Sequence, residues 1–188
     1  RFVAVNYASN ALGTINDVKA VADAAHAVGA LVFVDSVQFS PHFLTDVKAI
    51  GCDFLACSAY KYYGPHQGMV WGRRALLELL DPYKVRPADD TLPSRFETGT
   101  QSHEGMAGTL GCIEHFEWIG ETMGSGGATR RERLVAGFDV VAAYEKDLAR
   151  HLINGLQSIP GMQVKGLSGE ADLDDRVPTV CVTRDGVD

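Results

Sequence analysis

The sequence predicts an α/β fold in which a mainly parallel sheet is covered by helices. Two short apolar runs, ALVFVD at residues 30–35 and DFLACS at residues 53–58, are bounded by turn residues and end in a polar residue. Such runs are typical of strands buried inside a parallel sheet. Residues 16–28, ahead of the first run, place apolar side chains at the helical spacing i, i+3, i+4 and i+7. The alternation of strand, helix and strand favours an α/β architecture.

The first half of the chain carries most of the predicted sheet. Gly29 supplies a stop for the first helix, and Gly64, Pro65 and Gly68 turn the chain back after residue 58. The predicted elements are a strand (2–7), a loop (8–14), a helix (16–28), a strand (32–35), a short helix (47–50), a strand (54–57), a strand (69–72) and a helix (73–80).

The second half predicts a change of architecture. Residues 81–100 contain three prolines and little periodicity, and a loop of this length inside a compact domain is usually functional. The glycine cluster at 123–133 lacks the phosphate-loop pattern and follows no strand, so we interpret it as a hinge. We expect residues 1–122 to be the C-terminal portion of a large domain, and residues 123–188 to begin a smaller α+β domain. The predicted elements of the second half are a helix (103–119), a helix (130–158) whose solvated first turn is the run RRER, a strand (162–164) and a strand (179–183).

Composition limits the classes of function. The 188 residues carry a net charge of −7, which argues against a general nucleic-acid binder. No apolar run approaches the length of about 18 residues that a membrane span needs, and no Cys or carboxylate completes a zinc set with His103 and His115. The four cysteines show no CxxC spacing and predict reduced thiols in a cytoplasmic protein.

Both ends of the sequence lie within segments that show the strand-like pattern of an α/β fold. Residue 1 is Arg rather than Met and leads directly into a strand, and Asp188 follows an unfinished apolar run. We therefore expect the sequence to be part of a longer protein.

Polar side chains gather where the predicted strands end. Asp35 ends one strand, Gln38 follows it, and Ser58 and Lys61 follow the next. In open α/β sheets ligands bind outside the carboxyl ends of the strands. Pyridoxal phosphate needs a lysine to form a Schiff base with its aldehyde, a carboxylate to keep its pyridine nitrogen protonated, and donors for its phosphate. Lys61 and Asp35 are the candidates for the first two roles.

The segments VDSVQ, DFLACSAYKYYGPHQG and RFETGTQ together resemble the class V aminotransferase family, and most closely its cysteine-desulfurase-like branch. The resemblance implies the pyridoxal-phosphate-dependent transferase fold and a homodimer with a shared active site. Residue by residue, it assigns the cofactor ring to Asp35 and Gln38, phosphate to Ser58, and the Schiff base to Lys61. It also assigns a phosphate contact in the neighbouring subunit to Thr100, and a place beside the cofactor and the substrate carboxylate to Asn10.

One position departs from the family pattern. The desulfurases usually carry His before the lysine, where it helps to hold phosphate, and this chain has Tyr60. A phenol can donate the same hydrogen bond but does not become cationic near neutral pH. This change affects the expected substrate more than the expected cofactor.

The resemblance implies an enzyme that acts on a small amino-acid substrate in the manner of a cysteine desulfurase. A desulfurase also needs a nucleophilic cysteine on a mobile loop, and the family position for it is expected beyond residue 188. An aminotransferase, an epimerase or a Cβ-lyase on the same cofactor is therefore an alternative. A non-catalytic dimerisation or binding module of the same fold is another.

Overall fold

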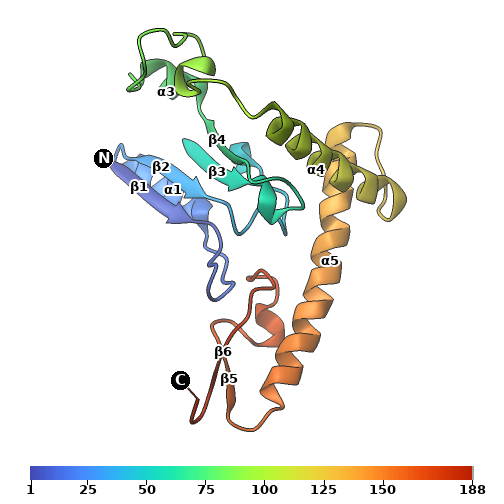
Figure 1. Cartoon of the computed structure of the whole chain (residues 1–188). Coiled ribbons are helices and arrows are strands. Elements are labelled where there is room, and N and C mark those ends of the chain that lie inside the picture. The colour runs from blue at the N-terminus through green and yellow to red at the C-terminus, as the bar shows by residue number, and fades with distance from the viewer. Residues whose placement is uncertain (188) are drawn as a thin grey trace.

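The computed structural model describes residues 1–187 and contains two sheets joined by two long helices (Figure 1). The strands are β1 (Phe2–Asn6), β2 (Leu31–Asp35), β3 (Phe54–Ser58), β4 (Gly68–Gly72), β5 (Met162–Lys165) and β6 (Cys181–Arg184). The α-helices are α1 (Val18–Ala27), α2 (Val47–Ile50), α3 (Arg74–Leu79), α4 (His103–Thr122) and α5 (Arg130–Gln157). Short 3₁₀ helices cover Ala59–Lys61, Ser94–Phe96 and Glu170–Asp172.

The larger sheet has the strand order β1-β2-β3-β4. The first three strands are parallel, and β4 pairs with β3 in the antiparallel direction. The register places Asn6 beside Asp35 and Asp35 beside Ala56. The carboxyl ends of β1, β2 and β3 therefore meet at one edge of the sheet. The mainly parallel sheet that the sequence predicts is confirmed.

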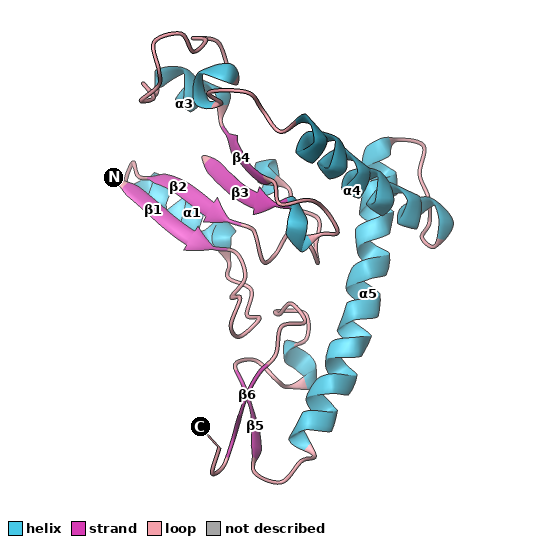
Figure 2. Ribbon diagram, viewed as in Figure 1, coloured by secondary structure: helices cyan, strands magenta, loops and turns pink. Residues whose placement is uncertain are grey.

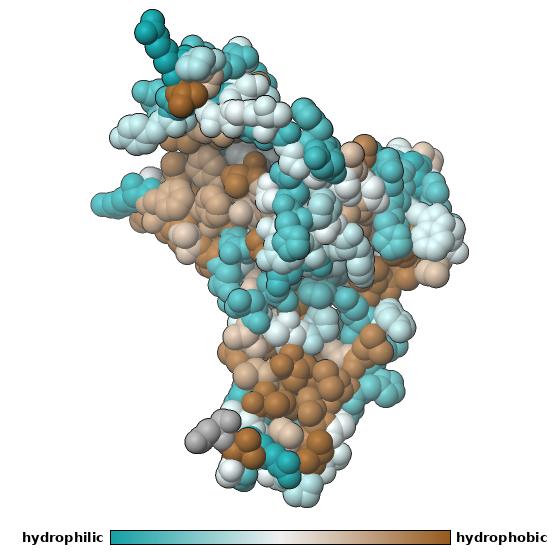
Figure 3. All heavy atoms as spheres, viewed as in Figure 1, coloured by the Kyte–Doolittle hydropathy of each residue, from teal (hydrophilic) through white to brown (hydrophobic). Residues whose placement is uncertain are grey.

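Helices cover one face of this sheet. Val32, Val34 and Leu55 point to that face and are buried against Val18 and Ala22 of α1. The opposite face carries Phe2, Phe33 and Val70 at paired or neighbouring positions; Phe2 and Val70 are 57% and 65% exposed. Figure 3 shows apolar residues on the viewed surface over this sheet and over the C-terminal hairpin.

Helix α5 begins at Arg130, as the sequence predicts, although its apolar stripe starts only at Leu134. Thr129 accepts a hydrogen bond from the backbone N–H of Glu132, and the Glu132 carboxylate accepts one from the backbone N–H of Thr129. This capping box satisfies two backbone donors that the first turn would otherwise leave free. The hydrophilic residues 130–133 are therefore helical although they carry no apolar pattern.

Helices α4 and α5 pack closely against each other. The buried ring of Phe116 stacks on Phe138 with a centroid distance of 4.2 Å. Beyond this contact, α5 extends to the antiparallel hairpin of β5 and β6 (Figure 2). The hairpin agrees with the expected small α+β unit, and its boundary at residues 122 and 123 stays a prediction.

The core around α4 predicts a loss of stability in alkaline solution. Burial raises the pKa of the Tyr62 phenol strongly, and it also raises the pKa of the Cys57 thiol. A group whose pKa is higher in the fold than in the unfolded chain favours folding while it is protonated. That stabilisation is complete below pH 9, the ordinary pKa of a cysteine thiol, and is lost as the pH rises towards the raised values.

We therefore expect the free energy of unfolding, measured with urea, to fall as the pH rises above about 9, and to fall further above about 10, the ordinary pKa of a tyrosine phenol. Tyr62→Phe should make this decline shallower, because it removes the phenol whose pKa is raised most strongly. Tyr83→Phe is the matched control, since the Tyr83 side chain is fully exposed. Equal pH profiles for Tyr62→Phe and wild type would contradict the explanation.

No helix within residues 1–187 combines the length and the apolar character that crossing a membrane requires.

Candidate active site

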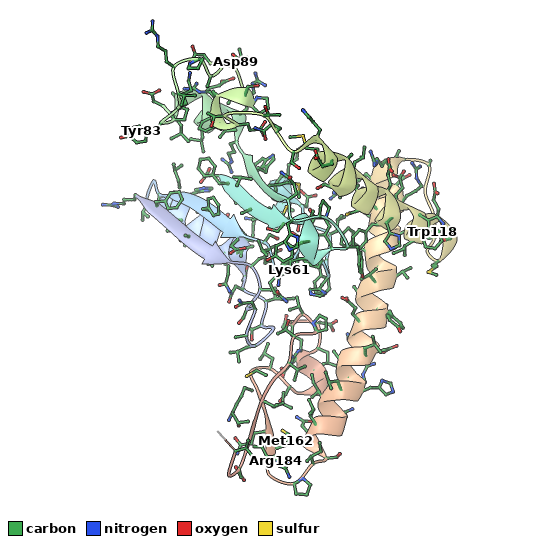
Figure 4. The ribbon with its side chains drawn as sticks, viewed as in Figure 1. Lys61, Tyr83, Asp89, Trp118, Met162 and Arg184 are labelled. Atoms are coloured by element: carbon green, nitrogen blue, oxygen red, sulfur yellow. The ribbon has the colours of Figure 1, made fainter. Side chains whose placement is uncertain are left out.

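A cavity of about 200 Å³ opens at the carboxyl edge of the parallel strands. Lys61 lies between this edge and the C-terminal part of the chain (Figure 4). The residues that line the cavity come from the ends of β1 and β2, from the loops after them, and from the 3₁₀ helix after β3. They are Asn6, Ala8, Asn10, Asp35, Val37, Gln38, Tyr60 and Lys61.

Asp35 is the last residue of β2, and its backbone carbonyl accepts a hydrogen bond from the N–H of Tyr7. Its carboxylate oxygen Oδ1 accepts a hydrogen bond of 2.9 Å from the backbone N–H of Val37. This short-range contact fixes the orientation of the carboxylate while leaving the side chain exposed. An exposed, oriented carboxylate at a strand end can accept a hydrogen bond from a ligand's N–H.

Lys61 ends the 3₁₀ helix Ala59–Lys61, and its ammonium group is exposed. Nζ lies 5.6 Å from the centroid of the Tyr60 ring, within reach of a cation–π attraction. The Tyr60 ring in turn stacks on His66, with a centroid distance of 5.3 Å. The cavity therefore has a primary amine and a phenol on the same wall.

The turn after Lys61 needs glycine at position 64. A Cβ there would lie 2.6 Å from Cys112 Sγ and 2.8 Å from the backbone oxygen of Ala59. Both contacts are too short for any side chain, because the turn packs directly on α4. The close packing of this turn fixes the 3₁₀ helix that carries Lys61.

Gln38 reaches the cavity from the turn after β2. Its side-chain Nε2 donates a hydrogen bond of 2.8 Å to Oγ1 of Thr179, which is 141 residues further along the chain. Asn10 lies on the loop after β1, where it is exposed. The site therefore includes one side chain that the C-terminal part of the protein holds in place.

The structure brings five of the seven predicted site residues to one cavity: Asn10, Asp35, Gln38, Tyr60 and Lys61. Ser58 is the last residue of β3, three positions before Lys61, and does not line the cavity. Thr100 lies apart, exposed and next to Gly99, while its neighbours Thr98 and Gln101 line a separate hollow beside β4. The roles assigned to these seven residues stay predictions.

Two contributors to the site were not predicted from the sequence. Asn6 lines the cavity from the end of β1, and its backbone oxygen accepts a hydrogen bond of 2.8 Å from Nδ2 of Asn16. Its position at the carboxyl end of a strand was a usable signal, because the rule that ligands bind at these strand ends also selects Asp35. Thr179 gave no such signal, because only the folded chain brings it to Gln38.

Three of the four cysteines are poor nucleophiles in this fold. Burial raises the pKa of the Cys52, Cys57 and Cys112 thiols, so they stay protonated near neutral pH. All four cysteines are free within the part of the chain that the structure describes.

Comparisons with known proteins agree on one family. A family model described as aminotransferase class-V matches residues 1–188. A protein named "Probable cysteine desulfurase" from Halalkalibacterium halodurans is 35% identical over 92% of this chain and 41% of its own length. "Aminotransferase-like protein FGM3" from Gibberella zeae is also 35% identical, over 100% of this chain and 43% of its own length.

Solved structures give the same result. The apo structure of a cysteine desulfurase from Thermococcus onnurineus NA1 superimposes with a TM-score of 0.81 at 26% identity. The match covers 99% of this chain and 44% of that chain. The chain thus spans less than half the length of the relatives that it matches.

Proposed function

Because the chain belongs to the class V aminotransferase family, whose members depend on pyridoxal phosphate, we propose that it forms the lysine-bearing part of an enzyme that acts on an amino acid. The proposed reaction resembles that of a cysteine desulfurase. One observation carries the proposal: an amine, a carboxylate and a carboxamide, from Lys61, Asp35 and Gln38, line a single cavity.

The side chains of this cavity fit pyridoxal phosphate chemically. Lys61 Nζ is a primary amine that can bond to the aldehyde, and the bond would be a Schiff base. Asp35 is a carboxylate that can accept a hydrogen bond from the pyridinium nitrogen. The Gln38 carboxamide can donate to the ring hydroxyl, and the Tyr60 hydroxyl can donate to phosphate. The phosphate contact that we propose for Ser58 would come from the end of β3, outside the residues that line the cavity.

When bound, pyridoxal phosphate supplies an electron-accepting ring to the amino acid that is joined to it. The negative charge of Asp35 keeps the ring nitrogen protonated, which makes the ring a better acceptor. Lys61 Nζ would take up or return the proton at the Cα of the substrate. Asn10, which lines the same cavity, would donate to the substrate carboxylate.

A homodimer that shares its active sites belongs to the same proposal. Thr100 is exposed and does not line the cavity of its own chain. Along the neighbouring helix α4, Met106, Leu110 and Trp118 are 40%, 49% and 49% exposed. Exposed apolar side chains on the helix that follows an exposed threonine support a subunit contact that would deliver Thr100 to the partner's phosphate. The free cysteines support a cytoplasmic location.

The reaction can be tested by incubating the cofactor-loaded protein with L-cysteine and dithiothreitol. In a desulfurase the sulfur leaves Cβ of cysteine for a thiol, which becomes a persulfide, and alanine is released. Dithiothreitol then reduces the persulfide and releases sulfide. We expect alanine and sulfide in equal amounts. Release of pyruvate and ammonia would instead identify a Cβ-lyase. Formation of the keto acid of cysteine would identify an aminotransferase, and formation of D-cysteine would identify an epimerase. Each of these results would overturn the desulfurase assignment.

An aminotransferase is the second candidate, and a specific observation favours it. The 35% identity to a relative named as aminotransferase-like supports this candidate. Conversion of a second amino acid to its keto acid, with a keto-acid acceptor present, would identify it.

A further inference from the structure

The segment around Thr179 is held rigidly against the loops of the cavity. Arg176 is only 3% exposed. Its guanidinium donates hydrogen bonds to the backbone oxygens of Leu167, Val177 and Thr179. One buried side chain thereby organises the backbone on both sides of itself.

The same segment pairs with the loop that follows β1. The backbone N–H of Ile15 donates to the oxygen of Asp175 at 2.9 Å, and that of Val177 donates to the oxygen of Gly13 at 2.8 Å. Gly13 has φ +80°, and a Cβ there would lie 2.6 Å from the backbone oxygen of Thr179. No side chain fits at this crossing, so the loop that bears Asn10 and the segment that bears Thr179 are in direct backbone contact.

These contacts fix Thr179 relative to Gln38. The hydroxyl oxygen of Thr179 accepts one N–H of the Gln38 carboxamide at 2.8 Å. A carboxamide carries two N–H donors and one oxygen. The hydrogen bond from one N–H to Thr179 restrains rotation of the carboxamide about the last side-chain bond of Gln38. The second N–H therefore points in a single direction. Gln38 also lines the cavity with Asp35 and Lys61.

We propose that Thr179 is a positioning residue for the cofactor: its hydroxyl orients the Gln38 carboxamide so that the second N–H serves the ring hydroxyl of pyridoxal phosphate. The inference rests on the proposed function and adds to it a contribution from the C-terminal segment. Binding of the cofactor is thereby coupled to docking of residues 175–179 on the loop after β1.

The test is a double-mutant cycle between Gln38 and Thr179, read as cofactor affinity. Pyridoxal phosphate is titrated into cofactor-free wild type, Thr179→Val, Gln38→Ala and the double variant, and the visible absorbance band of lysine-bound cofactor is followed. Thr179→Val keeps the shape of the side chain and removes the hydroxyl. We expect it to weaken binding about 2- to 10-fold, the worth of one hydrogen bond, and to have no effect in the Gln38→Ala background.

Two further variants separate positioning from general damage. Thr179→Ser keeps the hydroxyl and should restore wild-type affinity. In cofactor-free protein, the side-chain amide protons of Gln38, followed by NMR, should exchange with water faster in Thr179→Val than in wild type and Thr179→Ser.

The possible outcomes decide between the proposals. If Thr179→Val binds the cofactor as wild type does, or weakens binding equally with and without Gln38, Thr179 does not act through Gln38 and the inference is overturned. If wild type shows no band of lysine-bound cofactor, the proposed function itself fails, and the inference fails with it.

Discussion

Lys61→Ala is expected to abolish the visible absorbance band of lysine-bound pyridoxal phosphate, together with all turnover of amino acids. The variant removes the amine that lines the cavity beside Asp35 and Gln38. The free energy of unfolding without cofactor should stay within about 0.5 kcal/mol of wild type, because the side chain is exposed. The measurements are an absorbance spectrum after cofactor loading and a urea unfolding curve.

Lys48→Ala is the matched control for this variant. Lys48 is an exposed lysine on α2, away from the residues that line the cavity. It should keep the absorbance band and the activity of wild type. Loss of the band in both variants, or its survival in Lys61→Ala, would contradict the assigned role of Lys61.

Gly137→Ala is expected to cause a large loss of stability. A Cβ at this position of α5 would lie 2.1 Å from the backbone oxygen of Phe116 on α4. The facing Gly120 is equally confined, with its Cβ position 1.9 Å from the backbone oxygen of Arg133. Overpacking a core costs about 1–3 kcal/mol and occasionally more. The upper end applies here, because backbone atoms cannot move aside as side chains do.

Gly155→Ala lies in the same helix and provides the opposite expectation. No atom lies within 4 Å of the Cβ position at Gly155. The substitution should raise the free energy of unfolding by about 0.5–1 kcal/mol, since alanine is the better helix former. Urea unfolding of both variants checks the pair. A decrease of equal size in both would show that the α4–α5 crossing is not the reason.

The sequence predicted the part of the fold that depends on local patterns. Apolar runs located the strands that end at Asp35 and Ser58, and helical spacing located the helix ahead of the first of these strands. The carboxyl ends of parallel strands share one edge of the sheet, so Asp35 and Lys61 could be expected at one site, and the structure places both in one cavity.

Contacts between distant parts of the chain could not be predicted in this way. The hydrogen bond from Gln38 to Thr179 joins residues 141 positions apart, and neither residue type indicates the other. For Gly120 and Gly137, only the crossing of α4 and α5 shows that a larger side chain has no room.

The most direct test of the proposed site is chemical reduction of the loaded protein with sodium borohydride, followed by digestion and mass spectrometry. Reduction makes a bond between the cofactor and a lysine permanent, so the modified residue can be identified. We expect the mass of reduced cofactor on the peptide that contains Lys61. Modification of a different lysine, or of none in a protein that has bound pyridoxal phosphate, would contradict the proposed site.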